Sequence, residues 1–127
     1  MTKVEIFKKI LETCAEVCDV SSEDIMSGVR AENVVVARTI CVFWCMSAGF
    51  SVESMLKCTD RTNANSINSI TARVEDLWVN KFAFHILMKE VGKRLLDYAH
   101  SIGEDFDIVK PLNTIAKATD KYRVMNL

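Results

Sequence analysis

The chain has 127 residues, half of them hydrophobic, with a mean hydropathy of +0.13; the length fits one domain, or one small domain with an extension, and the composition excludes a disordered chain. Sixteen Lys and Arg against seventeen Asp and Glu give a net charge of −1, which excludes a polybasic protein that coats nucleic acid but allows a DNA reader with a local basic face. Four Gly and one Pro leave few helix breakers, so the sequence predicts an all-α fold, a small helical bundle.

The first predicted helix covers residues 2–19. Thr2 and Glu5 have the spacing of a capping box, in which each side chain bonds the other residue's backbone N–H. Apolar residues recur at helical spacing and are expected to share the core-facing side: Val4, Phe7, Ile10, Leu11, Cys14 and Cys18.

A short helix and a long helix follow. Ser21 opens the short helix over residues 22–26, and Gly28 ends it. After a linker that contains Arg30, a long helix over residues 32–47 is apolar on most of its faces. Such a helix belongs at the centre of a small bundle.

Residues 51–77 have the order of a helix-turn-helix motif. Ser51 caps a helix over 52–58, a polar break follows, and Thr62 or Asn63 caps a second helix. The residues expected to face inward from this second helix are Ile67, Ile70, Val74 and Leu77.

The character of the sequence changes after this motif. A helical stripe continues from Trp78 to Ile102, and a weaker helix opens at Pro111. We therefore divide the chain into a helix-turn-helix domain at 1–78 and a helical extension at 79–127 that packs on it or mediates oligomerisation. Phe82 and Phe84 cannot share a helix face, so one of them is a candidate for a protein–protein surface.

No membrane or secretion signal stands out. The first residues lack a continuous apolar region, and the most apolar stretch, 34–50, is interrupted by Arg38 and is shorter than a membrane span. We expect no membrane contact and a cytoplasmic location.

Five cysteines occur, at Cys14, Cys18, Cys41, Cys45 and Cys58. The first four form two pairs at i, i+4 spacing, so four thiols on two facing helices could bind zinc. Structural zinc sites, however, usually use CxxC knuckles, which are absent, and unpaired Cys is commonly a small buried hydrophobe. We expect reduced, metal-free thiols.

Catalytic patterns are also absent from the sequence. His85 and His100 have no matching Asp, Glu or Cys constellation, and there is no Gly-rich phosphate loop or nucleophile elbow. We expect neither an enzyme nor a cofactor.

The sequence from Ile10 to Leu77 resembles the C-terminal DNA-binding domain of DnaA, the bacterial replication initiator, a helix-turn-helix fold similar to that of the Trp repressor. "VSSEDIMSGVR" resembles the family's second lead helix and basic linker, and "VVVAR" resembles the start of its long helix. "SVESMLKCTDRTNANSI" has the length of the family's segment from the onset of the motif to its signature Val, which falls on Ile67. The resemblance implies a binder of double-stranded DNA without ATPase activity. Such a protein would be a regulatory protein, or one derived from a phage or a mobile element.

The resemblance implies DNA contacts for two arginines. Arg30 falls on a linker Arg that reaches a minor groove, and Arg38 on an Arg near the start of the long helix that touches the DNA backbone. The residues alone leave alternatives: Arg30 as a solvated side chain, and Arg38 as the ion-pair partner of Glu32 or a nearby acid.

The other DNA-binding candidates surround the start of the recognition helix. Asn pairs bidentately with adenine, and a helix N-terminus accepts a phosphate, but Asn and Ser are also ordinary helix caps. These candidates are Lys57, Arg61, Thr62, Asn63, Asn65 and Ser66.

Two functions therefore remain open. The first is DNA binding by a recognition helix that starts at Asn63. The second is a protein–protein interaction or oligomerisation module that uses the helix at 78–102. The spacing and the arginines favour the first function. The second is favoured by the loss of the family's Asp-His-Thr-Thr signature, and by a net charge of −2 over residues 1–75 (eight basic, ten acidic).

Overall fold

The computed structural model describes residues 2–51, 53–54, 82–102 and 117. In this part of the chain the fold is all-α, with four helices and no strand: α1 (Lys3–Cys18), α2 (Ser22–Met26), α3 (Glu32–Ser47) and α6 (Phe82–Ser101). The predicted small helical bundle is confirmed. The predicted helix-turn-helix, its inward-facing side chains and the weak helix after Pro111 lie outside the described residues, apart from helical residues 53–54 and 117.

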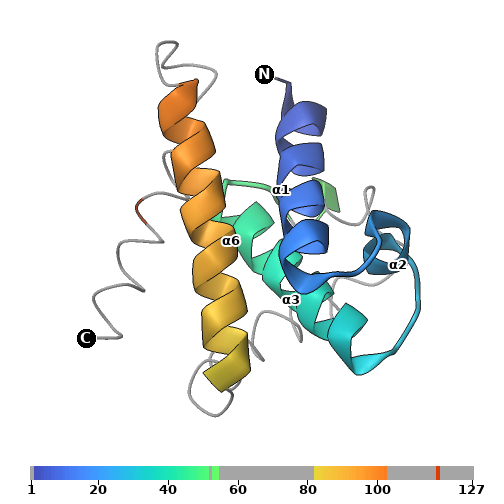
Figure 1. The fold of residues 1–127 in the computed structure, drawn as a ribbon. Helices are drawn as coiled ribbons and strands as arrows, with labels where there is room; N and C mark the ends of the chain where they lie inside the picture. The colour runs from blue at the N-terminus through green and yellow to red at the C-terminus, as the bar shows by residue number, and fades with distance from the viewer. Residues whose placement is uncertain (1, 52, 55–81, 103–116, 118–127) are drawn as a thin grey trace.

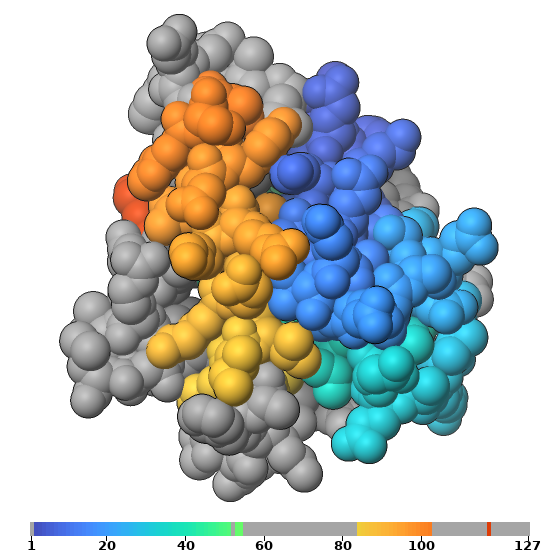
Figure 2. All heavy atoms as spheres, in the orientation of Figure 1, coloured from blue at the N-terminus to red at the C-terminus, as the bar shows by residue number. Residues whose placement is uncertain are grey.

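Helix α1 lies at the centre of the packing. It contacts α3 most extensively, and it also contacts α6 and α2. Figure 1 shows α1 and α6 side by side and antiparallel, with α3 crossing behind them and α2 beside the start of α3. The space-filling view in Figure 2 shows the same two helices forming adjacent strips of one face of the molecule.

The N-terminal end of α1 is fixed by the predicted capping box. The Glu5 backbone N–H donates to Thr2 Oγ1 at 3.2 Å, and the Thr2 N–H donates to the Glu5 carboxylate at 3.3 Å. The helix ends at Asp19, which has a left-handed backbone (φ 54°) and donates its N–H to the Ala15 and Glu16 carbonyls. Local sequence thus sets both ends of α1.

The start of the predicted apolar stripe on α1 was wrong at one position. Val4 is 62% exposed, whereas Ile6, which we did not place inward, is 2% exposed. The buried side of the helix is centred on Ile10 and Cys14, and Val4 lies about a quarter of a turn away from that direction. The other stripe residues of α1 are buried or half-buried.

Helix α3 has the predicted bounds and is apolar and buried on several faces, as expected, although α1 makes the more extensive contacts with the other helices. The side chains of α3 are buried against α1, α2 and α6. The buried apolar residues of α3 are Val34, Ala37, Ile40, Cys41, Val42, Trp44 and Cys45.

Helix α6 covers the other side of α1. It begins at Phe82 and ends at Ser101, close to the predicted end at Ile102. The residues that it buries are Phe84, Met88, Val91, Leu95 and Ala99. Phe84 is therefore a core residue, and the side chain of Phe82 lies outside the described residues.

Polar contacts seal the junction between α1 and α6. Arg94 pairs with Glu16 of α1 at 3.8 Å, and Lys9 Nζ lies 4.4 Å from the ring centre of Tyr98.

No helix in the described part of the chain is long and apolar enough to span a membrane.

Candidate nucleic-acid interface

The candidate interface begins at the linker between α2 and α3, which carries Arg30. This side chain is exposed, as its predicted role requires. The preceding short helix α2 is opened by Ser21, whose Oγ accepts the Asp24 backbone N–H at 3.0 Å. Ile25 is the buried residue by which α2 rests on the core.

Arg38 holds this linker from the inside. Its Nε donates to the Ile25 carbonyl at 2.7 Å, and its Nη2 donates to carbonyls of α2 and of the residues after it. These further acceptors are Asp24 O at 2.9 Å, Ser27 O at 2.6 Å and Val29 O at 3.0 Å. The last carbonyls of a helix lack partners within the regular helical pattern, and one guanidinium here donates to several of them at once. We call this set of bonds the Arg38 clamp. The Asp24 carbonyl also accepts the Ser27 N–H and the Ser27 hydroxyl.

Its burial places Arg38 apart from the predicted backbone contact with DNA. The residue is 3% exposed, and a guanidinium surrounded by main-chain carbonyls does not face a phosphate. The two predicted arginines therefore have different roles in the structure. Arg38 hydrogen-bonds the carbonyl of Val29, and Arg30 is the next residue in the chain. Arg38 donates to four main-chain carbonyls, a role that neither sequence interpretation anticipated.

The six other predicted DNA contacts fall beyond the described residues. These are Lys57, Arg61, Thr62, Asn63, Asn65 and Ser66. The residue before the predicted first helix of the motif is described. Ser51 Oγ accepts the Ser54 backbone N–H at 3.1 Å, which is the N-cap bond expected there.

Four thiols lie on α1 and α3, two on each helix. Cys14, Cys41 and Cys45 are buried, and Cys18 is half-buried; all four are present as thiols. Within the described ranges, no three His, Cys, Asp or Glu side chains are arranged to hold a metal ion.

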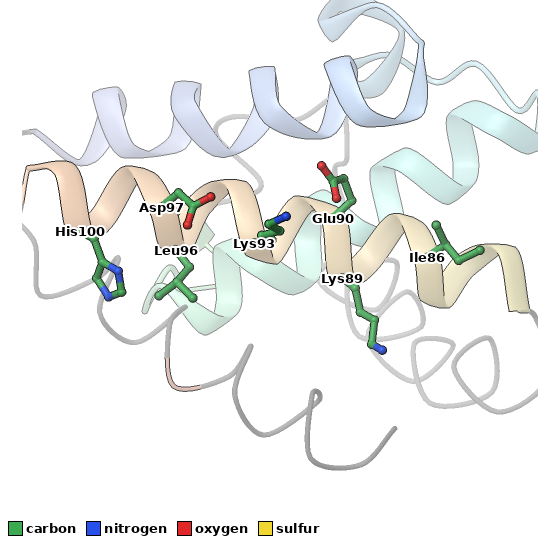
Figure 3. A pocket seen from close by; sticks show the side chains of 7 residues that line it. All are labelled: Ile86, Lys89, Glu90, Lys93, Leu96, Asp97 and His100. Carbon is green, nitrogen blue, oxygen red and sulfur yellow. The ribbon is translucent and has the colours of Figure 1, made fainter. Parts of the chain in front are cut away.

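A hollow lies along the outward face of α6. Apolar and charged side chains of both signs line it: Ile86, Lys89, Glu90, Lys93, Leu96, Asp97 and His100. Figure 3 shows Lys89, Leu96 and His100 projecting to the side away from α1. His100 is an exposed residue that lines this hollow.

Sequence reasoning missed the Arg38 clamp, although one signal was available. A single Arg in an otherwise apolar helix needs hydrogen-bond partners. The short helix α2 ends at Met26 with Ser27, not glycine, as its C-cap residue, and the carbonyls at a helix end are available as acceptors. Which carbonyls meet the guanidinium depends on how α2 docks, and this is a tertiary property.

Comparisons of the chain with family models, with curated proteins and with solved structures give no match.

Proposed function

We propose that this protein is a cytoplasmic binder of double-stranded DNA that uses a helix-turn-helix domain and lacks ATPase activity. The observation that supports this function best is the Arg38 clamp. Its bonds to the Ser27 and Val29 carbonyls tie the start of the α2–α3 linker to α3, and the exposed Arg30 follows directly in that linker. A pre-positioned Arg suits a narrow minor groove, whose negative potential attracts it.

In this proposal the roles are divided among the predicted residues. Arg30 enters the minor groove and Arg38 is a positioning residue. Lys57 and Arg61 bind phosphates, and Asn65 reads a base edge in the major groove with its neighbours Thr62, Asn63 and Ser66. Since phosphate contacts supply much of DNA affinity and the N-terminal part of the chain is net acidic, binding is expected to be weak in a monomer.

The test is selection of bound sequences from a random duplex library, followed by affinity measurements at several salt concentrations. Specific enrichment supports the proposal. Arg30→Ala is expected to weaken binding and to reduce the salt slope by about one if it removes one phosphate contact. Asn65→Ala is expected to relax base preference at one position by about 1–3 kcal/mol.

Arg94→Ala is the matched control. It removes the same charge from an exposed Arg, but Arg94 lies on α6 and pairs with Glu90 at 3.1 Å and Glu16 at 3.8 Å. It should leave the affinity within about twofold of the wild type, since it lies outside the proposed interface. Equal losses in the two variants would mean that only net charge matters, and no enrichment at low salt would reject the DNA-binding proposal.

The outward face of α6 favours a second function, self-association through this helix. Ile86 is 53% exposed there, and charged side chains of both signs, among them Lys89, Lys93 and Asp97, line the same hollow. Charges of both signs let two copies of a face pair opposite charges around an exposed apolar residue. Sedimentation velocity over a range of concentrations tests this function. Ile86→Asp is expected to give monomers, and Val4→Asp, at a 62% exposed valine of α1, is the control.

A further inference from the structure

Four thiols meet where α1 packs on α3. Cys14 and Cys18 lie one turn apart on α1, and Cys41 and Cys45 lie one turn apart on α3. Cys14 is fully buried, Cys41 is 4% exposed and Cys45 is 1% exposed. Cys18, near the C-terminal end of α1, is only half-buried. The cluster therefore has a closed interior and one member that reaches the surface.

The sulfur of Cys41 is the centre of this thiol cluster. The thiols of Cys14 and Cys45 both hydrogen-bond to it, and these bonds hold the pKa of Cys41 below its usual range. Burial raises the pKa of Cys14, and burial also raises the pKa of Cys18 to about 11. If one thiol of the cluster ionises, the sulfur that receives two S–H donors is the one that carries the charge.

We propose that the thiol cluster is a site of thiol–disulfide exchange, at which a low-molecular-weight disulfide oxidises Cys41 and a cysteine of α1 to a disulfide that joins α1 to α3. The partners lie on two helices that already pack against each other, and Cys14, Cys41 and Cys45 belong to the same buried cluster. The cross-link therefore joins helices that are already neighbours. This inference is independent of the proposed function.

The exchange balances with two protein thiols and one small disulfide. Cys18 is the half-buried member and the one that a small disulfide reaches; because its pKa is raised, the first step is slow at neutral pH. Cys18 gives up its proton and attacks the small disulfide, an S–S bond forms to Cys18, and one small thiolate leaves and takes up that proton. The Cys41 thiolate then attacks the Cys18 sulfur, and the second small thiol leaves. The protein has lost two electrons and two protons, which the small disulfide has gained as two thiols. Cys14 can replace Cys18 as the partner of Cys41 by internal exchange, with no further oxidant.

Peptide mapping of the full chain tests the proposal directly. The reduced protein is freed of reductant, incubated with oxidised glutathione, alkylated and digested with trypsin. Cleavage after Lys9, Arg30, Arg38 and Lys57 places Cys14 and Cys18 on peptide 10–30 and Cys41 and Cys45 on peptide 39–57. The expected product is a disulfide between these two peptides, with two of the five thiols lost.

Every other product contradicts the proposal. A loop within peptide 10–30 or within peptide 39–57 would place the disulfide inside one helix. A link to Cys58, a stable glutathione adduct at Cys18, or five unreacted thiols would show that Cys41 and α1 do not form a pair.

Two serine variants separate the central sulfur from its neighbour. Cys41→Ser should abolish the link between the peptides, whereas Cys45→Ser, on the same helix and equally buried, should retain it. Cys18→Ser should slow the reaction by about tenfold or more, because the remaining sulfurs are reached only when the core opens. The wild-type map decides the question even if Cys41→Ser fails to fold.

The melting temperature provides an independent readout. A cross-link between α1 and α3 restricts the unfolded chain, so the oxidised wild type should melt at a higher temperature than the reduced protein. Oxidised Cys41→Ser should show no such increase.

Discussion

Arg38 is a buried charge whose attraction is directed at main-chain oxygen. A guanidinium has five N–H donors in a planar fork, and here the fork meets the carbonyls of Asp24, Ile25, Ser27 and Val29. Charge-assisted hydrogen bonds of this kind offset the loss of hydration that burial of the cation entails. The clamp therefore stabilises the fold only while the buried guanidinium keeps its hydrogen bonds to the carbonyls.

Arg38→Lys should lower the free energy of unfolding by about 2–4 kcal/mol, because a single ammonium on a shorter side chain cannot reach all four carbonyls. Urea denaturation followed by circular dichroism measures the change. The control is Arg94→Lys, on a side chain that is 46% exposed, where a change within about 0.5 kcal/mol is expected. Equal stabilities for the two variants would contradict the structural role of Arg38.

Trp44, unlike Arg38, is a buried side chain with a polar group that lacks a hydrogen-bond partner among the described residues. It is 1% exposed, packs edge-on against Phe43 at 4.8 Å between ring centres, and its indole N–H has no hydrogen-bond partner among the residues that the structure describes. Trp44→Phe removes this unpaired donor, which offsets part of the packing that is lost, so a decrease of at most about 1–2 kcal/mol is expected. Trp44→Ala should cost about 3–5 kcal/mol. Similar losses in both variants would show that the N–H carries no penalty.

The ends of the helices are set by local bonds. The caps at Thr2 and Ser21 satisfy backbone donors, and Asp19 ends α1 with a backbone conformation that favours glycine. Helix ends therefore contribute stability that can be altered without touching the core.

Asp19→Gly should raise the free energy of unfolding by about 0.5–1 kcal/mol, because glycine adopts a φ of 54° without the steric cost that a β-carbon brings. Asp97→Gly, the same change within α6, should instead destabilise by about 0.3 kcal/mol, the difference between the helix propensities of Asp and Gly. Thermal denaturation of both variants checks the signs. Destabilisation at both positions would show that the Asp19 side chain matters more than its backbone conformation.

Helix α6 has a buried side and an outward side with different energetic weights. Leu95 is fully buried and Ile86 is 53% exposed. Leu95→Ala should cost about 2–5 kcal/mol through lost burial and a cavity, whereas Ile86→Ala should change stability by less than about 0.5 kcal/mol. Denaturant unfolding of the two variants tests whether α6 is an integral part of the core. A small effect at Leu95 would show that α6 docks only loosely.

At the scale of the whole molecule, the thiols report on how tightly the core is closed. In reduced protein that has been unfolded, all five cysteines should react with a thiol reagent. In the folded protein, Cys14, Cys41 and Cys45 should react at least about a hundredfold more slowly, since reagent reaches them only through opening of the core. Rapid labelling of Cys14 in the folded state would contradict the packing of α1 on α3.

The parts of the fold that local chemistry controls could be predicted from the sequence. The capping box at Thr2, the cap at Ser21 and the bounds of α3 agree with the structure because each signal acts within a few residues. The sequence analysis placed Val4 in the core in place of Ile6, because the direction in which a helix is buried depends on its partner helix. The role of Arg38 was missed for the same reason, since its acceptors are 9–14 residues away in sequence. DNA binding stays a prediction.

The Arg38 clamp also determines which positions of the chain tolerate replacement. All four of its acceptors are peptide carbonyls, which every amino acid supplies, so no bond of the clamp needs a particular side chain as its acceptor. Two side chains help to place these carbonyls: Ile25 docks α2 on the core, and Ser27 Oγ donates to the Asp24 carbonyl and accepts the Val29 N–H. At position 38 only arginine offers a fork of donors. In this part of the molecule, the linker can diversify its surface chemistry around Arg30 while its path along the core is inherited unchanged.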